Sequence, residues 1–376
     1  MLTLNAFGKE AEITGKCCLN GIPLNQTMFA KHFCIVPQED SHRPFLTCRE
    51  SIRYAADFYL KGTPESKDEE VEKLLLRLGL DTCRNTRVGN QFIQGLSGGQ
   101  KKRLSVAIAL LKKPSVLLLD EPTSGLDAAS SSHVMGYIRD LAKSLNIIVI
   151  CTIHQPSSAI YNSFNKVLLL SSGRTAFLGS PERSVSYFTS IGFNNPPNTN
   201  PAEFLLDVIN AEFTDPESVK FVLDTWSQQE EKEFAAHQRL VDINTNEPDA
   251  SSLAHLTIMQ QFYFVLKRQL YITLVDPMLY LGRAVMFLFG CTFFAIIYVY
   301  SRNREQEQVF NHLWMSTWFF GVPTSLGVIG VFAFNEKFKA VKKEVKNGMY
   351  TSWVYFIKTF FFLNLSFFSF SNDFIF

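Results

Sequence analysis

The chain has 376 residues, which is long for one domain, and its formal net charge of +1 gives no reason to expect a nucleic acid partner. Aromatic residues make up 14% of the chain, and most of its 35 Phe lie in the last third. This change of composition along the chain predicts a change of environment, from water to an apolar medium.

The first segment, residues 1–226, alternates apolar runs with helical patterns, as is typical of an α/β domain. Val116–Leu119 is a solid apolar run, and Asn146–Ile153 is a second one. Such runs suit parallel strands that are buried on both faces. We therefore expect a parallel sheet with helices around it.

Two connecting segments follow this domain. Residues 227–252 are polar and have no apolar periodicity, which predicts a linker. Residues 253–277 predict an amphipathic connecting helix over Leu253–Val275, with Lys267 and Arg268 on its polar side. Pro277 ends this helix because proline cannot continue it.

The last segment, residues 278–376, predicts a partial membrane domain with spans near 284–300, 309–334 and 351–372. The first two spans hold no charged residue and the third holds only Lys358, whose stem can reach toward the headgroups. Apolar runs near twenty residues match the thickness of a bilayer. A buried core helix could explain one such run, but it explains three in succession poorly.

The loops between the spans predict an orientation. Residues 335–350 carry five Lys against two Glu, whereas residues 301–308 balance two Arg with two Glu. Positive loops remain in the cytoplasm, so we expect the lysine-rich loop and the N-terminal domain there. Three spans place the C-terminus on the opposite side.

The strongest motif is Leu96-Ser97-Gly98-Gly99-Gln100, which precedes a helical pattern that Pro114 stops. Ser97 is a good N-cap, and the glycines leave backbone N–H groups uncovered at the helix start. A helix start of this kind favours a phosphate. Taken alone, the segment is equally well explained as an ordinary capped turn.

Further polar residues follow the apolar runs. Val116–Leu119 is followed by Asp120 and Glu121, where an Asp can hold Mg²⁺ through water and a Glu can polarise an attacking water. The next residues predict a tight turn that ends at Asp127, His154 follows the second apolar run, and Gln38 follows a shorter one. Each alone has a structural explanation, such as the exit from a strand.

In order and spacing these motifs resemble the ATP-binding-cassette (ABC) ATPases, which implies ATP and Mg²⁺ as cofactors. The implied fold is an incomplete α/β P-loop NTPase-like ABC nucleotide-binding domain followed by a partial all-α transmembrane helical domain. The resemblance implies catalytic roles for Glu121 and His154, with His154 on the γ-phosphate. It implies metal binding by Asp120 and Gln38, and nucleotide binding by Gln38, Asp127 and the signature segment 96–100.

Several features resemble the G subfamily of ABC transporters, whose members export lipids, sterols, pigments or drugs. The nucleotide domain precedes the membrane domain, and Thr152–Ser158 (TIHQPSS) and Asn200–Phe204 (NPAEF) match that family. Glu336–Tyr350 resembles its cytoplasmic coupling loop. The resemblance implies a half-transporter that forms a homo- or heterodimer in a lipid bilayer and exports a hydrophobic or amphipathic substrate.

The chain departs from the family in one motif. No G-x-x-x-x-G-K-[ST] phosphate loop is present, since Gly8-Lys9 precedes Glu10 and Gly15-Lys16 precedes Cys17. With only three spans as well, we expect a record truncated at both ends.

Two other functions stay open at this stage. A non-catalytic subunit would lend its signature segment to a partner's ATP site. A soluble ABC ATPase of the DNA-repair type is disfavoured by the apolar spans.

Overall fold

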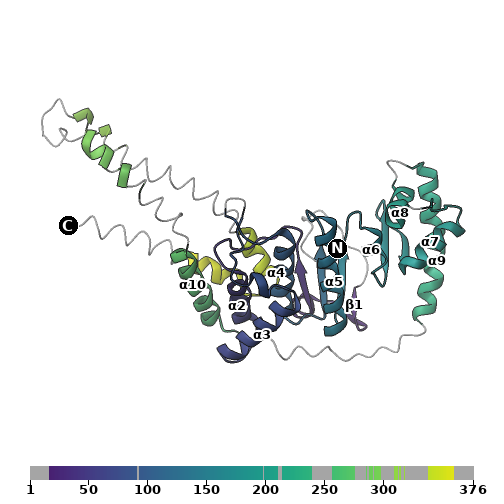
Figure 1. Cartoon of the computed structure of the whole chain (residues 1–376), viewed down its shortest axis with the longest axis horizontal. Coiled ribbons are helices and arrows are strands. Elements are labelled where there is room, and N and C mark those ends of the chain that lie inside the picture. Colours follow the sequence, from purple (N-terminus) through teal and green to yellow (C-terminus); the bar gives the residue numbers. More distant parts are fainter. Residues whose placement is uncertain are drawn as a thin grey trace. The chain divides into compact units, whose positions relative to one another are not determined.

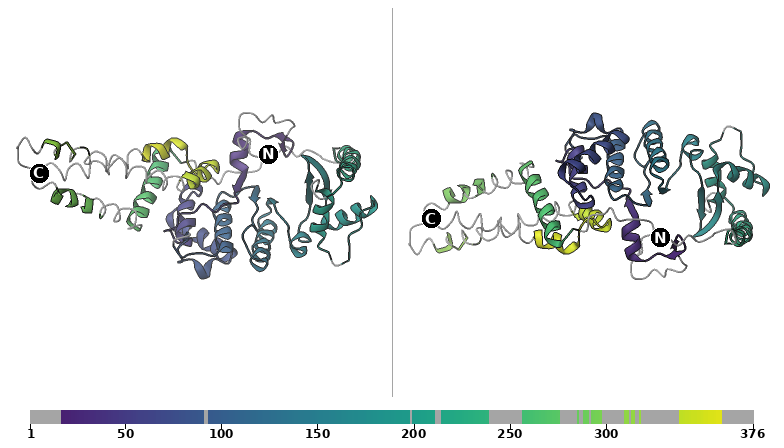
Figure 2. Two further views of the ribbon diagram at one scale, coloured as in Figure 1. Left: turned by 90° about the horizontal axis from the view of Figure 1, so that it is seen from above. Right: turned by 90° about the horizontal axis from the view of Figure 1, so that it is seen from below.

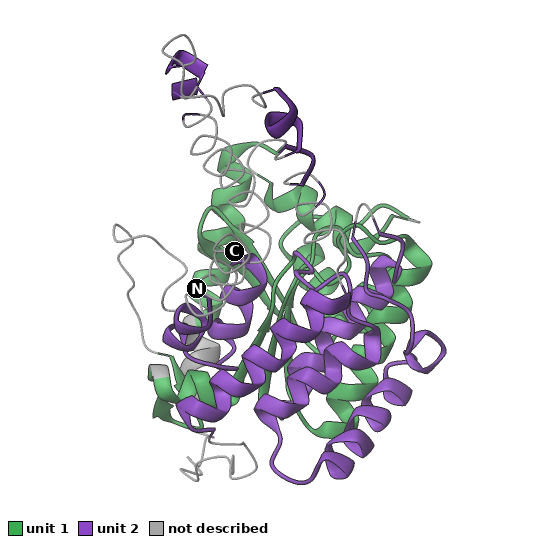
Figure 3. Cartoon of the chain, turned by 90° about the vertical axis from the view of Figure 1, so that its left-hand side faces the viewer, with its two compact units in different colours: residues 1–38, 115–249 green, residues 39–114, 250–376 purple. Residues whose placement is uncertain are grey.

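The computed structural model describes most of the chain. The described residues are 17–90, 93–197, 199–210, 214–238, 256–275 and 338–359, with 285, 288–290, 292–297, 309–311, 313–314 and 317. The chain divides into two compact units, of which unit 1 is residues 1–38 with 115–249 and unit 2 is residues 39–114 with 250–376 (Figure 3).

Unit 1 holds all the strands that the structure describes, together with six helices (Figure 1). The strands are β1 (Cys18–Leu19), β2 (Ile22–Pro23), β3 (Phe33–Val36), β4 (Val116–Asp120), β5 (Ile148–Thr152), β6 (Val167–Ser171) and β7 (Arg174–Gly179). The helices are α1 (Gln26–His32), α5 (Ala128–Leu145), α6 (Ser158–Tyr161), α7 (Pro181–Ser190), α8 (Pro201–Ile209) and α9 (Pro216–Gln238).

The parallel sheet of unit 1 has the order β3-β4-β5, with Val116 paired to Phe33 on one side and to Ile148 on the other. The first four residues of β4 are buried, as the apolar run predicts for a central strand. The prediction that β5 is also buried on both faces is wrong. Ile148 is 58% exposed and Ile150 is 48% exposed, because β5 has a described neighbour on one side only.

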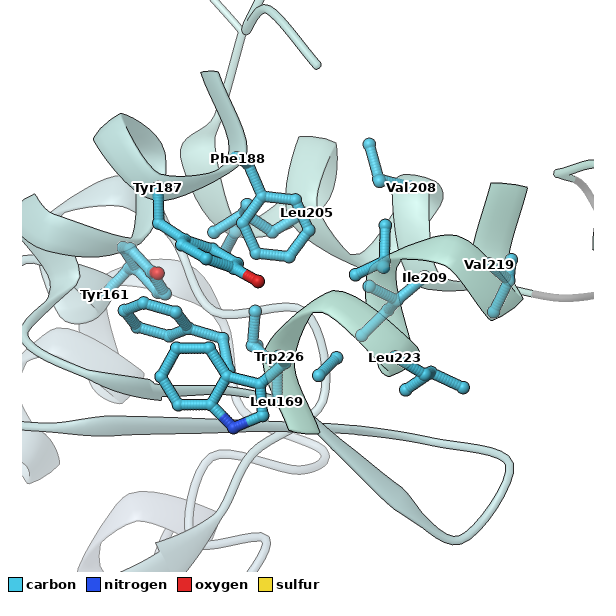
Figure 4. Close-up of a cluster of buried hydrophobic side chains, with 14 residues drawn as sticks. Tyr161, Leu169, Tyr187, Phe188, Leu205, Val208, Ile209, Val219, Leu223 and Trp226 are labelled. Atoms are coloured by element: carbon cyan, nitrogen blue, oxygen red, sulfur yellow. The ribbon is translucent and has the colours of Figure 1, made fainter. Parts of the chain in front are cut away.

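A separate core lies around the β6–β7 hairpin, which pairs antiparallel. Helices α7, α8 and α9 gather beside this hairpin in both views of Figure 2. The aromatic rings of Phe177, Tyr187, Phe188 and Trp226 form its centre, with the rings of Tyr187 and Trp226 packed edge to face at 5.2 Å (Figure 4). Aromatic pairs in this geometry stabilise a core beyond the area that they bury.

Helix α9 extends further than the sequence indicates. It continues to Gln238, so it includes residues 227–238 of the segment expected to be a linker. The remaining linker residues, 239–252, lie outside the described residues.

Unit 2 consists of helices in the part of the chain that the structure describes. They are α2 (Cys48–Tyr59), α3 (Pro64–Arg77), the 3₁₀ turn η1 (Asp81–Cys83), α4 (Gly98–Leu110) and α10 (Ile258–Val275). Residues 338–346 and 352–359 are also helical. Helix α10 packs on α2, which in turn packs on α3 and α4.

The expected membrane spans 284–300, 309–334 and 351–372 lie mostly outside the described residues. Among the residues that are described, no helix combines the length and the hydropathy needed to cross a membrane. Lys358, in the described part of the third run, is buried and donates a 3.2 Å hydrogen bond to Gln269 of α10. Its ammonium group is therefore hydrogen-bonded inside unit 2, and its relation to a membrane stays a prediction.

Candidate functional site

Three of the predicted site residues meet at one edge of the parallel sheet in unit 1. Because β3, β4 and β5 run parallel, their carboxyl ends lie at the same edge, which is where ligands bind in open α/β sheets. Asp120 ends β4, Glu121 follows it, and Gln38 lies two residues after β3. Hydrogen bonds join Gln38 directly to Glu121, and join Asp120 to Glu121 through Thr152, while the roles expected for these residues stay a prediction.

Gln38 contacts the loop that follows β4. Its side-chain amide donates a 2.6 Å hydrogen bond to Oε2 of Glu121 and approaches Oγ of Ser124 at 3.4 Å. One carboxylate oxygen of Glu121 is therefore oriented by Gln38. A carboxylate offers about four lone-pair sites, so the others remain for a water or a cation.

Asp120 and Glu121 share a third partner, Thr152 at the end of β5. The Thr152 hydroxyl donates a 2.7 Å hydrogen bond to Oδ1 of Asp120 and accepts a 3.0 Å hydrogen bond from the backbone N–H of Glu121. Thr152 and Asp120 are also paired in the β4–β5 register. The sequence alone does not identify Thr152 as a site residue, because its contact with Asp120 depends on the register of two strands about thirty residues apart.

The turn after Glu121 leads into α5. Gly125 has a φ of 72°, and Leu126 N–H donates to the carbonyl of Thr123 at 3.2 Å, which closes a tight turn around Gly125. Asp127 is the N-cap of α5 and accepts a 3.0 Å hydrogen bond from Ser130 N–H. Hydrogen bonds from the side chain and backbone of Ser130 lower the pKa of Asp127. Asp127 therefore has a structural role of its own, whatever it contributes to nucleotide binding.

His154 follows β5 by two residues and is exposed. Its position on the same strand as Thr152 places it beyond the same sheet edge. The hydrogen bonds among the described residues join Gln38, Asp120 and Glu121 but do not include His154. Its role on the γ-phosphate stays a prediction.

The signature segment belongs to unit 2, where it begins α4. Ser97 is the N-cap, as the sequence predicts, and forms a capping box with Gln100. Gln100 N–H donates to Ser97 Oγ at 3.3 Å, and Ser97 N–H donates to Gln100 Oε1 at 2.9 Å. Leu96 is buried, whereas Ser97 and Gly98 are exposed. The first N–H groups of a helix have no intrahelical acceptor, so this end of α4 can accept an anion.

The oxygens at the edge of the unit 1 sheet suit a magnesium ion. Mg²⁺ commonly takes one or two carboxylates and completes its shell with water and substrate phosphates. Asp120 supplies a carboxylate and Gln38 a side-chain oxygen within this constellation. The described residues contain no cluster of three or more His, Cys, Asp or Glu that could hold a metal without such help.

A second polar arrangement lies inside unit 2, between α10 and the helix at 338–346. Arg268 is 4% exposed, and its guanidinium donates two hydrogen bonds to the carboxylate of Glu344, at 3.0 Å and 2.7 Å. Arg43 lies 3.4 Å from the same carboxylate, and the Tyr350 hydroxyl donates to it at 2.5 Å. The prediction that Arg268 lies on the polar side of its helix is wrong, because a carboxylate far along the chain pairs with it.

The electrostatics of this arrangement favour the charged pair. Burial by itself would raise the pKa of Glu344, but the charges of Arg268 and Arg43 outweigh burial and lower the pKa to about 2. Burial also opposes the charge of Arg268, yet Glu344 raises the pKa of Arg268. Nothing in the sequence pattern around residue 344 identifies this partner, beyond its place in a lysine-rich segment.

Comparisons with known proteins find similarity to ABC transporters. The model of the ABC transporter family matches residues 2–124, and the model of the ABC-2 type transporter family matches residues 154–227. ABC transporter G family member 26 of Arabidopsis thaliana is 41% identical over 205 residues, which is 54% of this chain and 30% of that protein. ATP-binding cassette sub-family G member 8 of Rattus norvegicus is 40% identical over 197 residues, which is 52% of this chain and 28% of that protein.

Among solved structures, cbiO1 from Clostridium perfringens, part of the ABC transporter complex cbiONQ, is 24% identical with a TM-score of 0.41. The match covers 47% of this chain and 70% of that one. The chain spans only 18% to 35% of the length of the curated relatives that it matches.

The match of residues 2–124 to the ABC transporter family model supports an ABC nucleotide-binding domain of the P-loop NTPase fold for this part of the chain. Both of the relatives quoted above are named as members of the G group of ABC transporters, and this chain is similar to them over about half of its length.

Proposed function

We propose that this chain is a subunit of a G-type ABC transporter that uses ATP hydrolysis to export a hydrophobic or amphipathic substrate across a membrane. It would act as a half-transporter in a homo- or heterodimer, with the nucleotide-binding domain in the cytosol. The observation that carries the proposal is the contact of Gln38, Asp120 and Glu121 at one sheet edge. The G-family relatives support it independently.

Each residue at the sheet edge has a proposed role. Asp120 and Gln38 would hold Mg²⁺, Asp120 through water, and the ion would neutralise charge that develops on the transferred phosphate. Glu121 would orient and polarise the attacking water through the oxygen that Gln38 leaves unoccupied. His154 would contact the γ-phosphate after a movement that brings it to the site.

The signature segment would act on a different nucleotide. In the family that this chain resembles, each ATP lies between one phosphate loop and the signature helix of the partner. The exposed Ser97 and Gly98 at the start of α4 would bind the γ-phosphate of the partner's ATP.

Movement would pass to the membrane domain through residues 335–350. In unit 2, Glu344 of this segment is fixed to α10 by Arg268 and to the segment after Gln38 by Arg43. Lys339 pairs with Glu39 at 2.9 Å, directly beside Gln38 in sequence. A change at Gln38 on nucleotide binding therefore has a short covalent and ionic path to the coupling loop.

A second function, a non-catalytic subunit, is favoured by the capping box that keeps the signature helix intact. The sequence contains no G-x-x-x-x-G-K-[ST] motif, so we expect the purified chain alone to release no phosphate from ATP.

The test measures phosphate release by the purified chain, first alone and then reconstituted in vesicles with a G-type partner. We expect no release alone, release with the partner, and a decrease of tenfold or more when the chain carries Ser97→Arg. Glu182→Gln, an exposed change on α7, is the control and should leave release unchanged. Absence of any increase with G-type partners would contradict both functions.

A further inference from the structure

Thr152 occupies a position where one side chain touches both carboxylate-bearing residues of the proposed site. It is the last residue of β5 and is paired in register with Asp120, the last residue of β4. Its hydroxyl lies 2.7 Å from Oδ1 of Asp120, to which it donates. The same oxygen lies 3.0 Å from the backbone nitrogen of Glu121, from which it accepts.

The backbone at Glu121 needs such support. Glu121 has a φ of 42°, in the left-handed region that residues other than glycine seldom adopt. This conformation turns the chain sharply at the end of β4. The hydrogen bond from Glu121 N–H to the Thr152 hydroxyl holds the peptide group between Asp120 and Glu121. The hydrogen bond from Gln38 holds the carboxylate of Glu121.

The residue type at position 152 fits the two contacts. A hydroxyl donates one hydrogen bond and accepts others, which valine cannot do at the same volume. Serine can do both, but the second branch of threonine restricts χ1 and suits a strand. Threonine therefore holds its hydroxyl in one direction on β5, toward the end of β4.

We propose that Thr152 is a positioning residue for the ATPase site, which fixes the Asp120 carboxylate and the Glu121 backbone relative to each other. Because Thr152 holds Oδ1 of Asp120, Oδ2 would accept a hydrogen bond from a metal-bound water. With its backbone anchored, Glu121 presents its carboxylate to the attacking water. This inference rests on the proposed function, because it assigns Thr152 a part in the same site.

The experiment compares Thr152→Val and Thr152→Ser with the unchanged chain, each assembled in vesicles with its G-type partner. Thr225→Val is the matched control, because Thr225 is half-buried on α9 and its hydroxyl donates a hydrogen bond to the carbonyl of Phe221 in its own helix. The first measurement is hydrogen–deuterium exchange of peptides covering residues 116–126. The second is the affinity for Mn²⁺ in the presence of ATP, together with the affinity for ATP in EDTA.

Thr152→Val should speed exchange at the Glu121 amide about fivefold to tenfold, which corresponds to one hydrogen bond of about 1 kcal/mol. It should weaken Mn²⁺ binding by a similar factor and leave ATP binding in EDTA unchanged. Thr152→Ser should restore both values to within about threefold, since it keeps the donor and the acceptor. Thr225→Val should match the unchanged chain.

Three outcomes would overturn the inference. Unchanged exchange at Glu121 in Thr152→Val would mean that the hydroxyl does not hold this backbone. Faster exchange with unaltered Mn²⁺ affinity would make Thr152 a structural residue only. A loss of Mn²⁺ affinity that Thr152→Ser fails to restore would point to damage rather than positioning. If the unchanged assembly binds neither ATP nor Mn²⁺, the proposed function fails, while the exchange measurement still decides whether Thr152 anchors Glu121.

Discussion

At the scale of single residues, the sheet edge of unit 1 divides its polar contacts among side chains of different chemistry. Glu121 receives a neutral amide from Gln38, whereas Asp120 receives a hydroxyl from Thr152. Among the described residues, the side chains that donate hydrogen bonds to these two carboxylates are therefore neutral. Both remain available to a divalent cation and to water, which is the chemistry that the proposed function needs.

Replacing Glu121 by Gln should remove the proposed base and retain the shape of the site. The new side chain keeps an oxygen that can accept the hydrogen bond from Gln38. In an assembly that holds ATP at this sheet edge, we expect phosphate release from that site to fall by about 10²–10⁴-fold, while ATP binding changes little. Single-turnover phosphate release and nucleotide binding measure the two effects, with Glu182→Gln as control. An equal loss of binding would assign Glu121 to affinity instead of catalysis.

His42 should make unit 2 sensitive to mild acid. It is half-buried, with Nε2 at 2.8 Å from Ser105 Oγ, and desolvation of the ring together with the charge of Lys343 lowers its pKa from 6.5 to about 3. Below pH 6.5 His42 is protonated in the unfolded chain, whereas it stays neutral in the folded state until the pH approaches 3. The stability that neutral His42 contributes is therefore complete above pH 6.5 and is lost as the pH falls toward 3, by at most about 1.4 kcal/mol per pH unit.

The measurement is the free energy of unfolding of unit 2 between pH 7 and pH 4.5, followed by hydrogen exchange in α4. Glu344 has a pKa lowered from 4.5 to about 2, so its own contribution is lost only below that interval. His42→Gln should flatten the pH dependence between 6.5 and 4.5. An equally steep decrease in the variant would assign the acid sensitivity to other groups.

At the scale of elements, a buried ion pair joins α10 to the helix at 338–346. Arg268 contacts Glu344 twice, and its guanidinium lies over the ring of Phe58, 5.7 Å from the centroid. Breaking one member of a buried pair leaves an uncompensated charge. The stability of α10 and the stability of the helix at 338–346 should therefore be coupled through this pair.

Arg268→Ala should destabilise the packing of α10 by about 3–5 kcal/mol. Glu344→Ala should cost a similar amount, and the double variant should cost less than the sum of the two, because no charge is left buried alone. The loss of trypsin resistance at residues 256–275 measures each effect. Lys267→Ala, on the neighbouring exposed residue, is the control. Strict additivity of the two changes would argue against direct coupling.

The elements also separate what a sequence can predict from what it cannot. The strand β4 and the N-cap Ser97 were predictable because their signals are local, an apolar run and a capping residue before two glycines. The exposure of β5 was not, because burial depends on which strands lie on either side. The Thr152 contact and the Arg268–Glu344 pair need the positions of segments that are distant in sequence, and charge on an apparent polar face gave the opposite expectation for Arg268.

At the scale of the whole molecule, the residues proposed to bind the nucleotide are divided between two units. Gln38, Asp120, Glu121 and His154 belong to unit 1, whereas the signature segment belongs to unit 2. A dimer in which each subunit completes the partner's site uses both units of each chain. The lysine-rich segment 335–350, part of unit 2, then has to lie on the same side of the membrane as both sites.

Membrane topology is the property that checks this arrangement. Lys342 is exposed on the helix at 338–346, and Ser301 begins the loop between the first two expected spans. With the native cysteines replaced by serine, Lys342→Cys should react with a membrane-impermeant maleimide only after the cells are permeabilised. Ser301→Cys should react in intact cells, because the positive loop remains in the cytoplasm and the adjacent loop crosses. Labelling of Lys342→Cys in intact cells would reverse the orientation and remove the coupling loop from contact with cytosolic ATP sites.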